Sequence, residues 1–330
     1  MTADDALVLG LDVGGTASRA VVVTLDGRLA GHGRAGGGNP ASRPPEVAAA
    51  SVATAIRIAL STADPGAVRA GVLGVAGFTR MAEPRVADSF EHAWRGAGLR
   101  CPMSVVADLS VVYVAATPAP SGTVLVAGTG AVAGRVDDRM LTRIAGGLGW
   151  LLGDEGSGFW LGRAAAREVA RALSAGQSLG LLGRLVTRRL LGDEPPTEPA
   201  RALVAEVYRR RPAELAALAP LVSEAAAAGD PTARAIVRDA VRWLTGTLAE
   251  VRDDAARTPI VLGGSVLTST GPIQNAVRRT LARRWNAPVL VTTTAAVGAA
   301  WLAARTVTDL DEQEAAALHD RLRVATAAIE

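Results

Sequence analysis

The sequence predicts a duplicated α/β protein with two mixed β-sheets, and two observations carry this prediction. A glycine-rich hairpin occurs at residues 9–31 and again at residues 123–147 of the 330-residue chain. Each copy reads as a β-branched strand, a glycine turn, a second apolar strand, a polar turn and a third strand. Helical segments alternate with strands after each copy, which is typical of α/β architectures. The chain length suits two domains of about 100–200 residues each.

The first copy opens a predicted domain at residues 1–117. Asp26 and Gly27 form its polar turn, and Pro45 marks a helix start because proline fits the first helical turn. The expected strands cover residues 7–13, 19–25, 28–34, 69–76 and 104–107, and the expected helices cover residues 45–62, 83–98 and 109–116. Prolines and a glycine within residues 118–122 indicate a turn into the second domain.

The second predicted domain covers residues 118–307. Its hairpin has a polar turn at Asp137 and Asp138, and the segment 146–158, with six glycines, leads into a helix at 159–173. Residues 177–258 read as an almost wholly helical insertion, with breaks at 192–196 and 229–231. The remaining expected elements are strands at 259–262 and 288–291, a helix from residue 271, and helices at 295–305 and 310–328.

Composition and charge exclude several classes of protein. Hydrophobic residues make up 49% of the chain and charged residues 20%, so a large core can form and global disorder is excluded. All 35 basic residues are arginines, interspersed with acids to a net charge of +3, which gives nucleic-acid binding little support. We expect the arginines of the insertion to lie on solvated helix faces, in preference to binding phosphate. These are Arg184, Arg188, Arg189, Arg209, Arg210 and Arg211.

Cysteine usage and the N-terminus bear on the compartment. Cys101 is the only cysteine, so neither a disulfide within the chain nor a thiolate metal site is expected. The first residues lack the positively charged region of a signal peptide, and no apolar run reaches the length of a membrane span. We therefore expect a cytoplasmic protein that binds no membrane.

The two glycine turns are the first candidate sites. Gly14, Gly15 and Thr16 follow Asp12 at the end of the first strand, and Gly128-Thr129-Gly130 occupies the equivalent place in the second copy. Glycine lets backbone N–H groups approach phosphate oxygens without a Cβ in the way. Asp12 is suited to hold Mg²⁺ through water. An ordinary hairpin turn with a capping Asp is the alternative for one turn alone, whereas the repeat favours phosphate binding.

Three further segments carry candidate residues. Asp108 ends a buried strand, where a carboxylate could accept a proton from an attacking hydroxyl or, equally, cap the following helix. Asp154 and Glu155 lie in GDEGSG, where they could bind sugar hydroxyls or cap a helix N-terminus. Gly263-Gly264-Ser265 follows a strand and suits a nucleotide base or ribose, although this short motif is weak by itself.

Together these residues resemble the BadF/BadG/BcrA/BcrD-type group of the sugar-kinase/Hsp70/actin ATPase superfamily, which includes N-acetylglucosamine kinase. The resemblance covers essentially the whole chain, and GDEGSG is its most specific motif. Its markers are DVGGTASR at 12–19, Asn39 in GGGNP, VAGF at 75–78, VVADLS at 105–110, GTG at 128–130, GGLGWLLGDEGSGFW at 146–160, VLGGS at 261–265 and AAVGAAW at 295–301.

The resemblance implies two RNase H-like domains with a cleft between them, and a terminal helix, 308–330, that packs back on the first domain. It implies phosphorylation of an amino sugar at the 6-hydroxyl by ATP with Mg²⁺, with N-acetylglucosamine as the first candidate, by a protein that is commonly a homodimer. By this likeness Asp108 is the general base and Asp12 organises Mg²⁺. Phosphate or adenosine contacts fall to Gly14, Gly15, Thr16, Gly128, Thr129, Gly130, Gly263, Gly264 and Ser265, and sugar contacts to Asn39, Asp108, Gly147 and Asp154.

The sequence departs from the family pattern at two positions that lie near the sugar in the family. Leu148 stands where GGWG has tryptophan, with Trp150 two residues later, and Ala131 stands where serine is usual. Glucosamine and N-acetylmuramic acid therefore stay open as substrates, as does a non-catalytic sugar sensor on the same fold. The single Cys101 argues against an iron–sulfur activator of an acyl-CoA reductase system, and the zinc motif of ROK kinases is absent.

Overall fold

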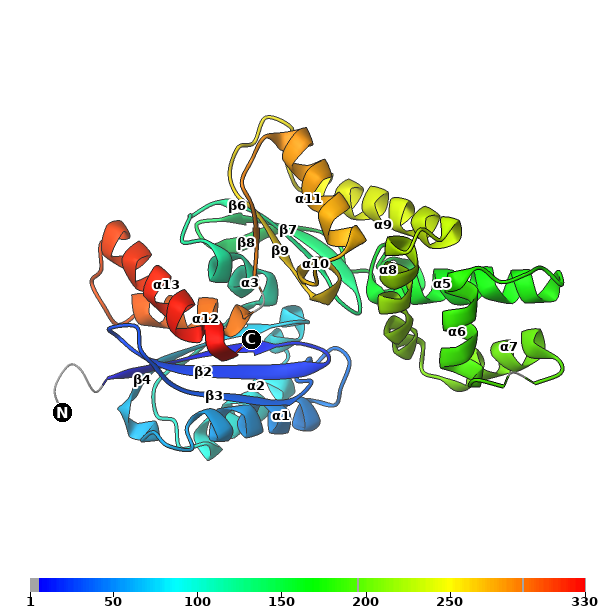
Figure 1. Cartoon of the computed structure of the whole chain (residues 1–330). Helices are drawn as coiled ribbons and strands as arrows, with labels where there is room; N and C mark the ends of the chain where they lie inside the picture. The colour runs from blue at the N-terminus through cyan, green and yellow to red at the C-terminus, as the bar shows by residue number, and fades with distance from the viewer. Residues whose placement is uncertain (1–5, 195, 293, 330) are drawn as a thin grey trace. The chain divides into compact units, whose positions relative to one another are not determined.

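The computed structural model describes residues 6–194, 196–292 and 294–329. It divides into two compact units, which are described one at a time (Figure 1). Residues 1–5, which entered the expectation about a signal peptide, and Pro195, within the first predicted helix break, lie outside the described residues. Unit 1 comprises residues 1–122, 136–142 and 292–330, and unit 2 comprises residues 123–135 and 143–291.

Unit 1 contains a five-stranded mixed sheet in the order β3-β2-β1-β4-β5. The first three strands form an antiparallel meander, and β4 and β5 add in parallel to β1. The parallel strands bring the ends of β1, β4 and β5 to one edge of the sheet. The strands are β1 (Leu7–Val13), β2 (Ala17–Thr24), β3 (Leu29–Gly36), β4 (Val68–Val75) and β5 (Met103–Ala107).

Helices cover both faces of this sheet. Figure 1 shows α1 (Pro45–Ala59) and α2 (Pro84–Gly96) on one face, and α12 (Ala295–Arg305) with α13 (Glu312–Thr326) on the other. The helix α3 (Asp108–Ala116) packs against α12. A Cβ on Gly10 would lie 2.2 Å from the carbonyl oxygen of Ala296, so glycine in β1 is what admits the backbone of α12.

Unit 2 repeats this topology with a sheet in the order β10-β9-β6-β7-β8. Read from the other end, the order β8-β7-β6-β9-β10 matches that of unit 1 strand by strand, so the predicted duplication and fold class are confirmed. The strands are β6 (Gly122–Ala127), β7 (Ala131–Asp137), β8 (Met140–Gly146), β9 (Ile260–Gly263) and β10 (Val289–Val291).

Most of the helical content of unit 2 lies between β8 and β9. The helix α5 packs with α8 and α9 around a buried aliphatic core that includes Leu125 and Leu262 of the sheet. The helices are α4 (Gly149–Leu152), α5 (Gly158–Ser174), α6 (Leu181–Leu191), α7 (Pro199–Arg209), α8 (Ala219–Ala227), α9 (Pro231–Ala249), α10 (Ser265–Thr268) and α11 (Pro272–Trp285), with a 3₁₀ segment at Pro212–Leu218.

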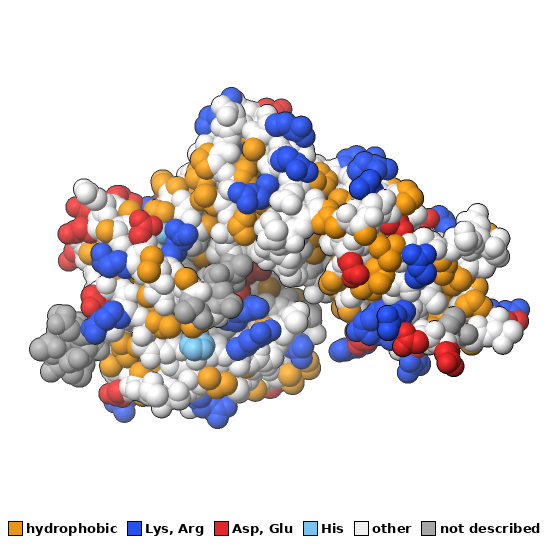
Figure 2. Space-filling view, viewed as in Figure 1, with side chains coloured by type: hydrophobic (Ala, Val, Ile, Leu, Met, Phe, Trp, Pro, Cys, Tyr) orange, Lys and Arg blue, Asp and Glu red, His pale blue; other side chains and the backbone are white. Residues whose placement is uncertain are grey.

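Four of the six arginines singled out in the insertion lie beside acidic residues. Figure 2 shows blue and red side chains interspersed over this region, at the right of the view. Arg188 pairs with Asp193, Arg209 and Arg210 both pair with Glu206, and Arg211 pairs with Glu214. Each of these guanidinium groups has an acidic partner nearby, which favours the solvated-face interpretation over phosphate binding. In the described part of the chain, no helix combines the length and the apolar character needed to cross a lipid bilayer.

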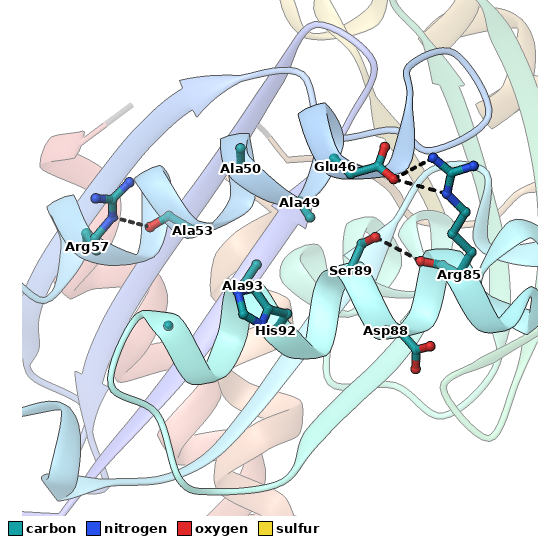
Figure 3. Close-up of a pocket in the computed structure, with 11 residues that line it drawn as sticks. Glu46, Ala49, Ala50, Ala53, Arg57, Arg85, Asp88, Ser89, His92 and Ala93 are labelled. Carbon is teal, nitrogen blue, oxygen red and sulfur yellow. Dashed lines mark hydrogen bonds and ion pairs between the residues drawn. The ribbon is translucent and has the colours of Figure 1, made fainter.

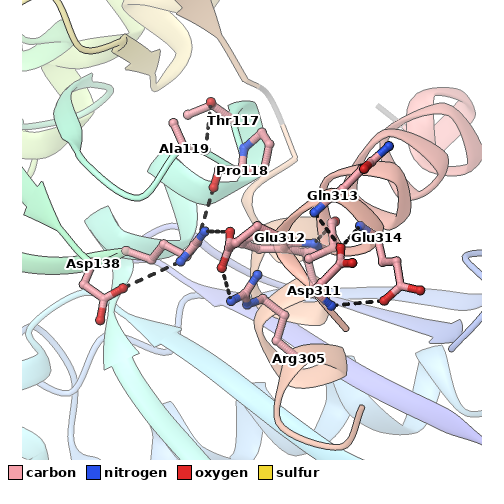
Figure 4. Close-up of polar contacts among 12 residues, drawn as sticks. Thr117, Pro118, Ala119, Asp138, Arg305, Asp311, Glu312, Gln313 and Glu314 are labelled. Carbon is pink, nitrogen blue, oxygen red and sulfur yellow. Dashed lines mark hydrogen bonds and ion pairs between the residues drawn. The ribbon is translucent and has the colours of Figure 1, made fainter. Parts of the chain in front are cut away.

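The second polar turn differs from the expected Asp137-Asp138. The residues with positive φ are Asp138 and Arg139, at 47° and 62°. The buried Arg139 donates from its backbone N–H to Pro120 O at 2.7 Å and lies over the Trp301 ring at 5.5 Å. It also pairs with Glu312, which forms a second ion pair with Arg305 at 2.8 Å (Figure 4). These contacts within unit 1 hold a left-handed arginine that local turn preferences do not select.

The helix α12 also lies elsewhere than the predicted domain limits place it. The sequence assigned residues up to 307 to the second domain, whereas the structural units group residues 292–330 with unit 1. Small residues explain the packing: a Cβ on Gly298 would lie 2.4 Å from Val111 O of α3. The buried His319 of α13 contacts Val114 O of the same unit through Nε2 at 2.8 Å.

Candidate active site

The first glycine turn follows β1 at the carboxyl edge of the unit 1 sheet. The Gly14 N–H donates to Ala17 O at 3.0 Å and closes the turn, while Gly15 and Thr16 are exposed. Neither glycine has a positive φ, so the backbone conformation does not demand glycine. A Cβ on Gly15 would meet nothing within 4 Å. The open space around the Gly15 backbone is therefore the feature that suits a phosphate.

Asn39 lies beside this turn. The Gly38 N–H donates to Gly14 O at 3.0 Å, and a Cβ on Gly37 would lie only 2.0 Å from Gly15 O. The Asn39 Oδ1 atom accepts the Ala41 N–H at 2.7 Å and would be 2.5 Å from a Cβ on Gly77. The structure thus brings Asn39 to the same edge of the sheet as the glycine turn.

Asp12 and Asp108 form a pair of carboxylates at this edge. Burial raises the pKa of Asp12 to about 6; the Arg19 guanidinium lowers it, and the charge of Asp108 raises it. Arg19 is the register partner of Asp12 on β2, and its Nη1 atom lies 3.5 Å from Asp12 Oδ2. The sequence analysis did not single out Arg19. The only signal for Arg19 in the sequence is its place in the hairpin: it follows the glycine turn about as far along the chain as Asp12 precedes it.

Asp108 is not the N-cap residue of α3, because it is the first residue of that helix and Ala107 occupies the N-cap position. The Asp108 carboxylate accepts the adjacent Leu109 N–H at 2.9 Å and its own backbone N–H. Burial raises the pKa of Asp108 above the ordinary value for aspartate. Among the described residues no cation lies within hydrogen-bond range of this half-buried carboxylate, which makes it a candidate proton acceptor.

The second glycine turn, in unit 2, is held from behind by a helix. The Gly128 N–H donates to Gly130 O at 2.9 Å, as the Gly14 N–H closes the first turn. The first N–H groups of α5 donate to the turn carbonyls, Gly158 to Gly128 O at 2.7 Å and Phe159 to Thr129 O at 3.2 Å. In both turns the N–H of the first glycine is already used, so phosphate contacts are better assigned to the residues after it.

Gly264 lies against the same turn. Its φ is +80°, and a Cβ there would come 2.5 Å from Ala127 O. Gly263 ends β9 and Ser265 begins α10, so the Gly263-Gly264-Ser265 segment meets the start of the second glycine turn. The structure thereby joins two of the motifs that the sequence suggested for nucleotide binding.

Asp154 connects the second turn to the GDEGSG segment. With φ +59°, it accepts the Ala131 N–H on Oδ1 at 3.2 Å, and the Gly149 N–H also donates to its carboxylate. Burial raises the pKa of Asp154. The N-cap of α5 is Ser157, which accepts the Trp160 N–H at 3.2 Å. A serine that was not predicted therefore occupies the N-cap position of α5, while Asp154 and Glu155 precede it as charged residues near the N-terminus of the helix.

Gly147 lies next to this group, since its N–H donates to Ala131 O at 2.9 Å. The predicted site residues fall into two groups. Unit 1 contains Asp12, Gly14, Gly15, Thr16, Asn39 and Asp108. Unit 2 contains Gly128, Thr129, Gly130, Gly147, Asp154, Gly263, Gly264 and Ser265.

The described residues fit a metal ion that takes most of its ligands from phosphate oxygens and water. Among the described residues, no group of three or more His, Cys, Asp or Glu side chains is placed to hold a metal ion. Asp12 is nevertheless a half-buried carboxylate next to a second one, and it pairs with the Arg19 guanidinium at 3.5 Å. Mg²⁺ keeps several waters and needs only one or two carboxylates when phosphates supply other oxygens.

A groove of about 720 Å³ on unit 1 lies apart from all of these residues (Figure 3). It runs between α1 and α2, with Ala49, Ala50 and Ala53 along one side and the Glu46–Arg85 ion pair at one end. None of the predicted site residues lines it. Its volume alone therefore gives no reason to move the candidate active site.

The chain is similar to a known family and to several solved structures. The model of the BadF/BadG/BcrA/BcrD ATPase family matches residues 9–303. A Chromobacterium violaceum structure described as a candidate N-acetylglucosamine kinase is 27% identical, with a TM-score of 0.71, covering 91% of this chain and 99% of that one. No curated protein matches.

Two further structures support the fold alone. A Porphyromonas gingivalis protein, also described as a candidate N-acetylglucosamine kinase, is 19% identical with a TM-score of 0.69, over 91% of this chain and 100% of that one. A ROK family glucokinase from Streptomyces griseus, in complex with glucose and AMPPNP, is 21% identical with a TM-score of 0.57, over the same shares of both chains.

Proposed function

This chain belongs to the BadF/BadG/BcrA/BcrD ATPase family, and we propose that it is an ATP-dependent sugar kinase. The finer proposal is transfer of the γ-phosphate to the 6-hydroxyl of an amino sugar, with N-acetylglucosamine as the first candidate substrate. The similarity to the Chromobacterium violaceum protein supports the sugar class.

The observation that carries the proposal is Asp108. Its half-buried carboxylate has a raised pKa, and Ala107, not Asp108, occupies the N-cap position of α3. As the sugar oxygen bonds to the γ-phosphorus, Asp108 would take the hydroxyl proton, and ADP would leave with the electrons of the broken P–O bond. A positioned base of this kind contributes typically about 10²–10⁴-fold to a rate.

Phosphate binding is assigned to the backbone N–H groups of Gly15 and Thr16 in unit 1 and of Thr129 and Gly130 in unit 2. Gly14 and Gly128 would support these groups by closing their turns. Adenosine is assigned to Gly263, Gly264 and Ser265, because Gly264 packs on the start of the second turn. When bound, Mg²⁺ would neutralise phosphate charge, and Asp12 would hold it through water.

The sugar is assigned to Asn39, Asp108, Gly147 and Asp154. Asp154 has one carboxylate oxygen on the Ala131 N–H, and a carboxylate has further lone pairs that can accept sugar hydroxyls. Asn39 likewise keeps its amide N–H₂ group for a hydroxyl while Oδ1 accepts the Ala41 N–H.

The test is an assay of ADP release with ATP, Mg²⁺ and a panel of N-acetylglucosamine, glucosamine, N-acetylmuramic acid, N-acetylmannosamine and glucose. We expect strong turnover with N-acetylglucosamine and the phosphate on its 6-oxygen, read by NMR of the product. Turnover with another sugar alone would support the sugar kinase activity but contradict the assignment of N-acetylglucosamine as the substrate. Sugar binding without ADP release from any panel member would favour the sensor alternative and contradict the kinase.

A further inference from the structure

Unit 2 exposes an unusually apolar turn next to Asp154. We define the apolar turn as residues 148–152, which include the one-turn helix α4. Leu148, Leu151 and Leu152 are 65%, 72% and 75% exposed, and Trp150 is 46% exposed. Water disfavours such a concentration of large apolar side chains, which in folded proteins often marks a binding surface.

The backbone of the apolar turn is fixed by local contacts. Gly147 and Gly149 adopt positive φ values of 66° and 81°. The Gly149 N–H donates to the Asp154 carboxylate, and the Gly153 N–H donates to Gly149 O at 2.9 Å. The side chains are therefore presented by a defined turn.

Trp150 is oriented by a buried neighbour. Its ring meets that of Phe159 edge-to-face, with centroids 5.7 Å apart and planes at 66°. Phe159 is buried in α5, and its backbone N–H donates to Thr129 O in the second glycine turn. Trp150 is thus connected through one residue to the turn assigned to phosphate, and through Gly149 and Asp154 to the residues assigned to sugar.

We propose that Trp150 is a specificity-determining residue that receives the N-acyl group of an amino sugar substrate. This inference rests on the proposed sugar kinase function. The methyl end of an acyl group gains by leaving water against an indole ring and leucine side chains. A hydroxyl or an ammonium at the same carbon must give up hydration next to Leu148 and Leu151, which offer no hydrogen-bond acceptor in their side chains.

The experiment compares kcat/KM for N-acetylglucosamine, glucosamine and glucose in the wild type and in Trp150→Ala. We expect Trp150→Ala to lower kcat/KM for N-acetylglucosamine about tenfold through KM, with the other two sugars changed less than about twofold, because the lost contact serves ground state and transition state alike. Trp150→Phe should restore most of the loss. An equal fall for all three sugars, or no fall for N-acetylglucosamine, would overturn the assignment.

Tyr208→Ala is the matched control, because Tyr208 is an 86% exposed aromatic residue on α7 of the same unit. It should leave all three values of kcat/KM unchanged, and thermal denaturation of each variant verifies that the fold is retained.

The panel separates the failure of this inference from the failure of the proposed function. If the wild type phosphorylates only sugars without an acyl group, the kinase stands and the role of Trp150 is overturned. If it phosphorylates none, the proposed function fails, and calorimetric binding of N-acetylglucosamine decides the inference. Binding that Trp150→Ala weakens about tenfold supports it; unchanged binding, or none by the wild type, overturns it.

Discussion

The two glycine turns occupy equivalent places in the two sheets but differ in what surrounds them. Each follows the central strand of a five-stranded sheet of the same order, and each is closed by the N–H of its first glycine. Behind the first turn lie ionisable groups, Asp12, Arg19 and Asp108. Behind the second lie backbone contacts from α5 and from Gly264.

This difference assigns different roles to the duplicated halves. Duplication gives both units a glycine turn at a sheet edge, but the charged groups differ. The first turn has two carboxylates, Asp12 and Asp108, with Arg19 beside Asp12, whereas the second has the Asp154 carboxylate, which accepts the Ala131 N–H. The Asp12–Asp108 repulsion costs stability and suits cation binding and proton transfer. The close backbone packing of the second turn suits a preformed surface for a nucleotide. Four substitutions test this contrast.

Asp108→Asn is expected to have the largest effect. It keeps the shape of the side chain and removes the proton acceptor, so kcat for phosphoryl transfer should fall about 10²–10⁴-fold. Nucleotide affinity, measured by calorimetry, should stay nearly unchanged. Asp88→Asn, on the exposed surface of α2, is the control. Wild-type turnover in Asp108→Asn would remove Asp108 from the mechanism.

Asp12→Asn is expected to raise stability while it lowers Mg²⁺-dependent turnover. The pKa of Asp12 is about 6 in the folded protein, above its ordinary value of 3.8, so the folded state holds the proton more tightly than the unfolded chain. The free energy of unfolding therefore falls as pH rises from about 4 to about 6, and the loss due to Asp12 is complete above that range.

The shift of about two pKa units corresponds to at most about 3 kcal/mol of unfolding free energy. Urea unfolding without divalent ions should show Asp12→Asn more stable than the wild type near pH 8, with the difference vanishing near pH 3. A pH-independent difference would show that a structural change, and not the titration of Asp12, is responsible.

Gly264→Ala should destabilise unit 2. The substitution places a Cβ 2.5 Å from Ala127 O at a position with φ +80°, so the residue must shift or hold a strained backbone. Strain of this kind costs on the order of 1–3 kcal/mol, and Tm should fall accordingly. Gly246→Ala is the control, because a Cβ on that residue of α9 meets nothing within 4 Å. An unchanged Tm would mean that the second turn adapts more freely than its contacts indicate.

Gly15→Ala should have the smallest effect on stability, less than about 0.5 kcal/mol. The added methyl group enters open space, and φ at Gly15 is not positive. Because that space is where a phosphate is assigned, ATP affinity should nevertheless fall about tenfold in a calorimetric titration. A loss of stability without a change in affinity would contradict the assignment of the first turn to phosphate.

Much of the fold was predictable because strand and helix patterns are local. The apolar strands, their glycine turns and the proline-marked helix starts predicted the elements of both units to within a few residues. The turn at Asp138 and Arg139 was not predictable, because its conformation depends on Glu312, which lies 173 residues away in sequence. The one-turn helix α4 was missed for a related reason: its glycines indicate only a loop.

The candidate site was predictable in its residues more than in their roles. The glycine turns, Asp108 and GDEGSG could be selected from the sequence because few other structures need those residues at those places. The N-cap residues themselves, Ala107 before α3 and Ser157 before α5, were not predicted, because the exact first residue of each helix depends on tertiary contacts. The orientation of Trp150 on Phe159 had no local signal, since it depends on how α4 meets α5.

The sequence by itself determined the duplicated α/β fold, the two glycine turns and the list of candidate residues, because local periodicity and glycine spacing encode them. Tertiary structure alone decided that α12 packs on β1, that Asp12 and Asp108 share one edge and repel, and that Asp154 joins the second turn to the apolar turn. The physical reason is that close backbone approach, burial and charge coupling depend on residues distant in the chain.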